Sequence, residues 1–325
     1  MEFRTPVDLP AYPFRIGYEH KGMLLGSCFA GAVGARMERM KMPVTVNPFG
    51  VVYNPASLVD TLERLEQGAP LAEEELREDR GLWFAFSHPG AFASPDRAQA
   101  LAAINRSIQQ GHRALLQADY LILTLGTAWV YELAESGRIV NNCHKIPAAA
   151  FRRRRLIADE IAEAFVRLLE RPLYRNKHIL LTVSPIRHLK DGLTENSLSK
   201  SILRVAAQAV VDRCENAHYF PAYEIVMDDL RDYRFYERDM VHPSAVAADY
   251  VWEAFCGALV DEKALSLFPR IEKIRSAREH RPFHPQSTEH QAFRKAMLSE
   301  IKALQQACPG LDFADEYDWF NQKRV

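Results

Sequence analysis

The stretch MLLGSCFAGAVGARMERMK, residues 23–41, decides the fold class of this chain. It begins with the short apolar run Met23–Leu25, which is typical of a buried strand, and turns at Gly26. Apolar residues then recur every three or four positions, as on one face of an amphipathic helix: Phe29, Val33, Met37 and Met40. A strand, a tight turn and a helix together predict the first half of a βαβ unit.

The same alternation of strands and helices continues to about residue 260. Largely apolar runs predict strands at Val44–Val46, Tyr120–Leu125, His178–Val183 and Ala217–Phe220. Helical spacing predicts helices at Ala56–Gln67, Pro95–Leu116, Ala148–Leu169, Asn196–Cys214 and Pro243–Leu259. Trp129–Val140 predicts a β-hairpin, and Ala222–Val226 predicts either an extension of the preceding strand or a new one. The pattern indicates an α/β fold, with a mainly parallel sheet covered by helices on both faces.

The domain organisation follows from where this alternation stops. Residues 1–260 are predicted to form one α/β domain with an insertion at about residues 68–95. Residues 261–325 are charged and helical without strand signals, which predicts a C-terminal helical extension. A chain of 325 residues is long enough to bury a large core.

Composition excludes several classes of function. Lys and Arg total 41 against 42 Asp and Glu, so no charge bias favours nucleic acid or a membrane surface. Five scattered cysteines without a C-x-x-C pair argue against disulfides and structural zinc, and we expect no metal and no cofactor. No signal peptide or bilayer-length apolar run is visible, so we expect a cytoplasmic protein without a membrane span. The oligomeric state is left open.

Gly26-Ser27-Cys28 closes the first predicted strand, at the sheet edge where α/β proteins bind ligands. A nucleophile here would lie at a helix N-terminus, whose free N–H groups stabilise a thiolate and a developing oxyanion. The structural alternative is that Ser27 is an N-cap and Cys28 an inert residue of the first helical turn.

Asp239 and His242 lie three residues apart, just before the last predicted helix of the α/β region. In a turn, this spacing can place the carboxylate on one imidazole nitrogen and leave the other nitrogen free to act as a base. Such a pair would lie at the same sheet edge as Gly26-Ser27-Cys28. The alternative is an exposed polar turn with no catalytic role.

Three other features carry weaker signals. Arg187 and His188 follow a predicted strand at this edge and would either contact substrate or brace loops. We interpret the four arginines Arg152–Arg155 as a solvated helix turn, because the overall charge is balanced. Ser197–Lys200 matches S-x-x-K without its companion motifs, and we interpret it as a chance match.

Several ordered blocks resemble the GSCFA family, in the SGNH/GDSL-like hydrolase superfamily. Gly26-Ser27-Cys28-Phe29-Ala30 is similar to the motif that names the family. The other blocks are Asn47–Pro55, Thr124–Trp129, Asn142–Lys145, Ser184–His188 and Asp239–Pro243. The resemblance covers roughly residues 20–260 and implies a flavodoxin-like three-layer sandwich.

The resemblance also implies roles for particular residues. The superfamily's first block is usually Gly-Asp-Ser, so an ungapped match makes Cys28 the nucleophile, and a one-residue shift makes it Ser27. We favour Cys28, because the spacing from strand to glycine to nucleophile and the following helix then match. Gly50 and Gly126 would serve the oxyanion hole, and Asp239 and His242 would be the acid and base.

This chain departs from the family pattern in the third block, which reads Gly126-Thr127-Ala128 where an asparagine is usual. Asn142, Asn54 and Thr127 are candidate replacements. We favour Asn142, because it follows the predicted hairpin that leads back from that strand end. Asn54 and Thr127 are also candidate substrate-binding residues, together with Arg187 and His188.

The resemblance therefore implies an acyl esterase that cleaves an O-acyl ester through a Cys (or Ser)-His-Asp acyl-enzyme mechanism. The expected partner is a small-molecule or carbohydrate acyl ester, with O-acetyl as one candidate. Two alternatives stay open: an acyltransferase with the same nucleophile, and a non-catalytic binding module that retains the fold.

Overall fold

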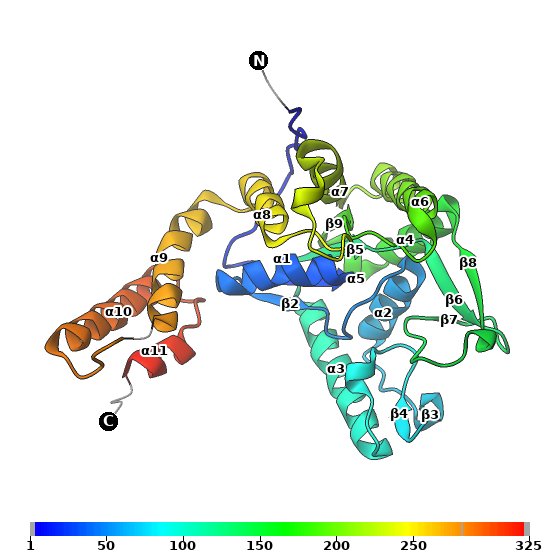
Figure 1. Cartoon of the computed structure of the whole chain (residues 1–325), viewed down its shortest axis with the longest axis horizontal. Coiled ribbons are helices and arrows are strands. Elements are labelled where there is room, and N and C mark those ends of the chain that lie inside the picture. The colour runs from blue at the N-terminus through cyan, green and yellow to red at the C-terminus, as the bar shows by residue number, and fades with distance from the viewer. Residues whose placement is uncertain (1–3, 281, 322–325) are drawn as a thin grey trace.

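Five parallel strands form the central sheet in the computed structural model, which describes residues 4–280 and 282–321 (Figure 1). The strands are β1 (Gly22–Gly26), β2 (Val44–Val46), β5 (Tyr120–Leu125), β9 (His178–Val183) and β10 (Ala217–Tyr219). Their spatial order is β2-β1-β5-β9-β10. This is the flavodoxin-like order 2-1-3-4-5, whose ligands bind where the order reverses, here between β1 and β5. The predicted α/β class is confirmed.

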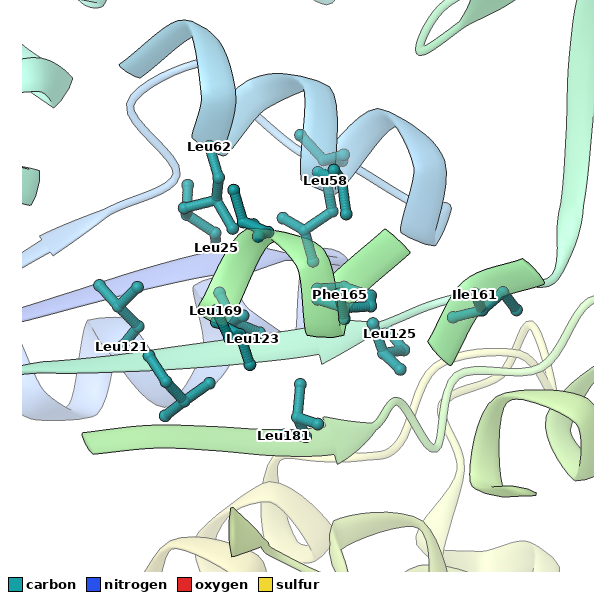
Figure 2. Packing of buried hydrophobic residues seen from close by; sticks show 14 of the residues in the cluster. Leu25, Leu58, Leu62, Leu121, Leu123, Leu125, Ile161, Phe165, Leu169 and Leu181 are labelled. Atoms are coloured by element: carbon teal, nitrogen blue, oxygen red, sulfur yellow. The ribbon is translucent and has the colours of Figure 1, made fainter. Parts of the chain in front are cut away.

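One face of the sheet is covered by four helices: α2 (Pro55–Gln67), α3 (Arg97–Gln117), α4 (Ala158–Leu169) and α6 (Gly192–Arg213). Figure 2 shows Leu58 and Leu62 of α2 meeting Leu25 and Leu123 of the strands. Phe165 of α4 packs in the same cluster. Each fully buried leucine contributes about 2 kcal/mol of hydrophobic stabilisation.

The opposite face carries α1 (Cys28–Arg39), α7 (Ala222–Glu224), a π-helix (Ile225–Leu230) and α8 (Ala245–Leu259). Alternate strand residues point to this face, namely Leu24, Ile122 and Leu180. The predicted strand at Ala222–Val226 is therefore wrong, because these residues are helical and close over the sheet. Helix α8 begins at Ala245 with Ser244 as its N-cap, two residues later than predicted.

A second, antiparallel sheet flanks the domain and consists of β6 (Trp129–Leu133), β7 (Ile139–Val140) and β8 (Phe151–Arg155). The hairpin predicted at Trp129–Val140 is confirmed. The long helix predicted at Ala148–Leu169 is wrong in nearly its first half, because β8 pairs along the whole of β6 before α4 begins at Ala158. A short hairpin, β3 (Arg77–Asp79) and β4 (Leu82–Phe84), lies within the 68–95 segment, and α5 spans Pro172–Arg175.

The four arginines of β8 are strand residues, so their interpretation as a solvated helix turn is wrong. Each pairs with a carboxylate from a neighbouring segment: Arg152 and Arg154 with Glu132, Arg153 with Asp191, Arg154 also with Glu160, and Arg155 with Glu195. Hydrogen bonds from Arg154 and Arg152 hold the pKa of Glu132 below its ordinary value. The arginine run thus fastens β8 to β6, α4 and α6.

Three further helices follow the α/β region: α9 (Glu262–Glu279), α10 (Thr288–Ala307) and α11 (Ala314–Asn321). Figure 1 shows them beyond α8, on the side of the molecule away from β6 and β8. Ion pairs join them to α1 and its C-terminal end, including Arg39 with Glu272 and Lys41 with Glu316. Within the described ranges, no helix is long and apolar enough to cross a membrane.

Candidate active site

A sharp turn at Gly26 places Cys28 at the start of α1. Gly26 has φ +136°, and a Cβ atom there would lie 2.2 Å from the carbonyl oxygen of Thr124, so only glycine fits. The Gly26 N–H donates to Asn47 Oδ1 at 2.9 Å, and the Ser27 N–H donates to the Thr124 carbonyl at 3.2 Å. These bonds fix the end of β1 against the ends of both β2 and β5.

The side chains of Ser27 and Cys28 have different environments. Ser27 is the N-cap of α1: its Oγ accepts from the Phe29 N–H at 3.2 Å, and the residue is only 2% exposed. Cys28 is the first helical residue and is half-buried, with its Sγ 3.9 Å from the Tyr53 hydroxyl. The more accessible of the two candidate nucleophiles is therefore the thiol.

Asp239 and His242 form the hydrogen-bonded pair that their spacing predicts. His242 Nδ1 lies 2.7 Å from Asp239 Oδ2, while Asp239 Oδ1 accepts from the backbone N–H groups of Val241 and His242. These hydrogen bonds lower the pKa of Asp239 to about 2, and the bond from the His242 backbone N–H contributes most. The carboxylate is thus ionised at neutral pH and orients the ring through Nδ1, which leaves Nε2 as the outward nitrogen. About half of each side chain is exposed.

The turn that carries this pair is held at both ends. Tyr236 and Pro243 form an antiparallel bridge, and the Ser244 N–H donates to the Phe235 carbonyl. The Arg187 N–H donates to the Val241 carbonyl, and its guanidinium lies 3.9 Å from the centre of the Tyr236 ring. Arg187 therefore braces the turn, which is the second of the two roles that its position suggested.

Arg36 ties the start of α8 to the first turns of α1. Its guanidinium donates to the Ala32 carbonyl, one turn beyond Cys28, and to the Ala245 carbonyl, three residues beyond His242. It also pairs with Asp249. The Asp239–His242 turn is thus anchored on the side of the sheet that α1 covers.

Gly50, predicted to serve the oxyanion hole, lies in the turn after β2, and that role stays a prediction. Gly50 has φ +76°, and its N–H donates to the Asn47 carbonyl at 2.7 Å, which closes a tight turn. The N–H is therefore not free for a ligand. Asn54, predicted to bind substrate, is instead the N-cap of α2: its amide bonds the Ser57 N–H and Oγ, and the residue is buried.

Gly126 is also unavailable as an oxyanion donor, because its N–H donates to the Tyr53 carbonyl at 3.0 Å. The Thr127 N–H donates to the same carbonyl at 2.9 Å. The Thr127 hydroxyl accepts from the Trp129 N–H and contacts Ser199 Oγ, so it caps the turn after β5. A side chain at position 126 would lie 2.6 Å from the Tyr53 carbonyl, which explains the glycine.

The Gly126 carbonyl accepts two hydrogen bonds from below the sheet edge. One comes from His188 Nε2 at 2.8 Å and the other from Lys200 Nζ at 2.6 Å, and Lys200 also donates to the Ser184 carbonyl at 2.7 Å. Burial lowers the pKa of His188 to about 4 and that of Lys200 to about 7. His188 is therefore neutral at pH 7 and braces this edge through the Gly126 carbonyl.

Asn142, the favoured replacement for the missing asparagine, is held through its backbone N–H, which donates to the Phe86 carbonyl. Its side-chain Nδ2 is buried, and no partner for it is found within the described ranges. The neighbouring Asn141 donates to the Val51 carbonyl, beside the Gly50 turn. An oxyanion role for Asn142 stays a prediction.

A cavity of about 250 Å³ lies between α2 and the 85–87 and 138–141 segments. Its lining is mixed: Asp60, Arg64 and Arg138 lie beside apolar side chains such as Phe49 and Leu71. None of Cys28, Asp239 and His242 lines it. This cavity is therefore separate from the candidate catalytic residues. Within residues 4–280 and 282–321, no group of three or more His, Cys, Asp or Glu side chains could hold a metal ion.

The sequence model of the GSCFA family matches residues 21–255, which span the central sheet, the Gly26 turn and the Asp239–His242 pair. The chain belongs to the GSCFA family. A second model, described as the C-terminal domain of GSCFA domain proteins, matches residues 271–324. No curated protein matches the chain.

Two residues of this GSCFA chain that lie at or below the site were given no role by the sequence. Tyr53 lies inside the Asn47–Pro55 block, but its place beside Cys28 depends on how the loop after β2 folds back. Lys200 belongs to the S-x-x-K match that we interpreted as chance, and the structure buries it to 1% exposure. Its helical spacing with the apolar residues Leu203, Ala207 and Val210 was the signal that could have found it.

Proposed function

We propose that this GSCFA protein is an acyl esterase of the SGNH/GDSL-like class that acts through a covalent acyl-enzyme. The observation that carries the proposal is the bonded Asp239–His242 pair, together with a half-buried thiol at a helix N-terminus. Cys28 follows β1 at the point where the strand order reverses, which is where ligands bind in such sheets. The substrate class is a small-molecule or carbohydrate O-acyl ester.

The reaction proceeds in two halves. His242 Nε2 accepts the proton of the Cys28 thiol, and the sulfur attacks the ester carbonyl carbon to give a tetrahedral adduct. The adduct collapses to a thioester as the alkoxide leaves and takes the proton from His242. Water then attacks the thioester, His242 accepts a proton from it and returns this proton to sulfur, and the carboxylic acid is released.

Asp239 supports both halves of this reaction. It holds Nδ1 of the imidazole and stabilises the imidazolium that forms when Nε2 accepts a proton. Because its pKa is about 2, this carboxylate keeps its charge throughout the neutral range. The N–H of Cys28 has no intrahelical acceptor, since it opens α1, and it is free to face the oxyanion.

The geometry favours Cys28 over Ser27 as the nucleophile. The Ser27 hydroxyl is buried and caps α1, so its use in catalysis would remove that cap. Hydrolysis is favoured over transfer because about half of the His242 and Asp239 side chains is exposed, which admits water to the acyl-enzyme.

Intact-mass measurement after reaction with p-nitrophenyl acetate tests the proposal. The native protein should gain one acetyl group and release nitrophenolate, whereas Cys28→Ala and His242→Ala should remain unacylated. Ser27→Ala should acylate with a lower thermal stability, and Cys143→Ala is the control for another half-buried thiol. Absence of any adduct on the native protein would favour the non-catalytic binding module, and full acylation of Cys28→Ala would move the nucleophile away from Cys28.

A further inference from the structure

Two of the hydrogen-bond donors that the family pattern would supply to the candidate site are already engaged within the fold. The N–H groups of Gly50 and Gly126 already donate to backbone carbonyls, and Asn54 is engaged as a helix cap. The N–H of Cys28 remains free beside the thiol and Asn142 stays a predicted donor, whereas acyl-transfer sites commonly use two or more donors. One further hydrogen-bond donor lies close to Cys28 Sγ.

The Tyr53 hydroxyl oxygen lies 3.9 Å from Cys28 Sγ. An oxyanion forms about 3 Å from its nucleophile and about 3 Å from its donors, and two groups 3.9 Å apart share such a point. We propose that the Tyr53 hydroxyl is a catalytic residue that donates a hydrogen bond to the oxyanion formed on Cys28, in place of the absent third-block asparagine. This inference rests on the acyl-enzyme chemistry proposed above.

The backbone of Tyr53 is held in place by the ends of both central strands. Its carbonyl accepts from the N–H groups of Gly126 and Thr127, and the preceding residue Val52 donates to the Gly26 carbonyl. On the other side of Tyr53, Asn54 is locked as the cap of α2. The hydroxyl is therefore carried by a fixed segment, as a preorganised oxyanion donor requires.

This anchoring continues beneath the Gly126 peptide. The N–H of that residue supports Tyr53, while its carbonyl accepts from Lys200 and His188. The buried Lys200 and the half-buried His188 thus hold the peptide unit that bonds the Tyr53 carbonyl. These two side chains therefore stabilise the backbone that positions Tyr53 beside Cys28.

The protonation state of the tyrosine suits a donor. Partial burial, and then the nearby Cys28, raise the pKa of Tyr53 to about 12, so its hydroxyl keeps its proton at neutral pH. A hydroxyl in this state donates to a developing negative charge without giving up its proton. His242 therefore remains the base in the reaction, and the tyrosine only stabilises the negative charge of the oxyanion.

Tyr53→Phe is the test, because it removes the hydroxyl and keeps the ring. Acetylation of Cys28 by p-nitrophenyl acetate, followed by single-turnover nitrophenolate release, should slow by about 10² to 10³. Alkylation of Cys28 by iodoacetamide, which forms no oxyanion, should change by less than about twofold. Tyr317→Phe, on a half-buried tyrosine of α11, is the matched control and should acetylate like the native protein.

Each outcome decides between the proposals. Equal acetylation of Tyr53→Phe and the native protein would overturn the tyrosine role while leaving the acyl-enzyme in place. An equal loss of acetylation and alkylation would also overturn it, because the tyrosine would then act on the thiol itself. Failure of the native protein to acetylate would overturn both proposals. Thermal unfolding of Tyr53→Phe should match that of the native protein, since 41% of the tyrosine is exposed and the substitution keeps its ring.

Discussion

Lys200→Met should change how the stability of the protein depends on pH. The Lys200 ammonium is only 1% exposed, and Nζ is held by the carbonyls of Gly126 and Ser184 at 2.6 and 2.7 Å. Removal of this group from water penalises its charged form and lowers its pKa to about 7. In the unfolded chain the pKa of a lysine is about 10.4.

The sign of the effect follows from proton counting. Between pH 7 and pH 10, the unfolded chain binds up to one more proton at Lys200 than the folded chain does. The free energy of unfolding therefore rises with pH in this interval, by about 1.4 kcal/mol per pH unit. From pH 7 to pH 9 the native protein should gain about 2 kcal/mol from this residue, because half of the lysine is already neutral at pH 7.

Urea unfolding at pH 7, 8 and 9 measures the effect. The native protein should gain stability relative to Lys200→Met as the pH rises, since all other titrating groups are shared by the two proteins. The lost hydrogen bonds to the two carbonyls add an offset that does not depend on pH. Lys302→Met, on an exposed lysine of α10, should show no such trend. A stability difference that stays constant, or that shrinks towards pH 9, would refute the reasoning.

Three further substitutions test the site and its supports. Asp239→Asn should slow acylation by about 10⁴ without unfolding the protein, and because the pKa of Asp239 is about 2, native activity should show no loss from this group between pH 4 and pH 7. Gly26→Ala should lower the free energy of unfolding by at least about 2 kcal/mol, measured by urea titration, since its Cβ would meet the Thr124 carbonyl. Asn54→Ala should cost about 1 kcal/mol through loss of the α2 cap and leave the KM for the ester unchanged, whereas a raised KM would restore its substrate-binding role.

The local pattern of the chain was enough to predict the α/β domain. The hydrophobic periodicity and the length of each segment distinguish the buried strand Tyr120–Leu125 from the amphipathic helices around it. Both features depend only on residues that are close in sequence. The Asp239–His242 contact was also predictable, because three residues in a turn bring the two side chains together without help from the rest of the fold.

The features that the sequence missed depend on partners that are distant along the chain. Phe151–Arg155 is a strand because β6 pairs with it and carboxylates from four places neutralise its arginines, although its isolated sequence is compatible with a helix. The sequence could not show that the N–H groups of Gly50 and Gly126 donate to backbone carbonyls, because those hydrogen bonds form only in the tertiary structure.

By itself, the amino-acid sequence determined the strand–turn–helix at Gly26, the alternation of elements and the Asp239–His242 pair. Only the tertiary structure decided that Tyr53 lies beside Cys28 and that Lys200 is buried beneath Gly126. The physical reason is that periodicity and turn chemistry are local, whereas the environment of a polar side chain is set by whichever segments fold against it.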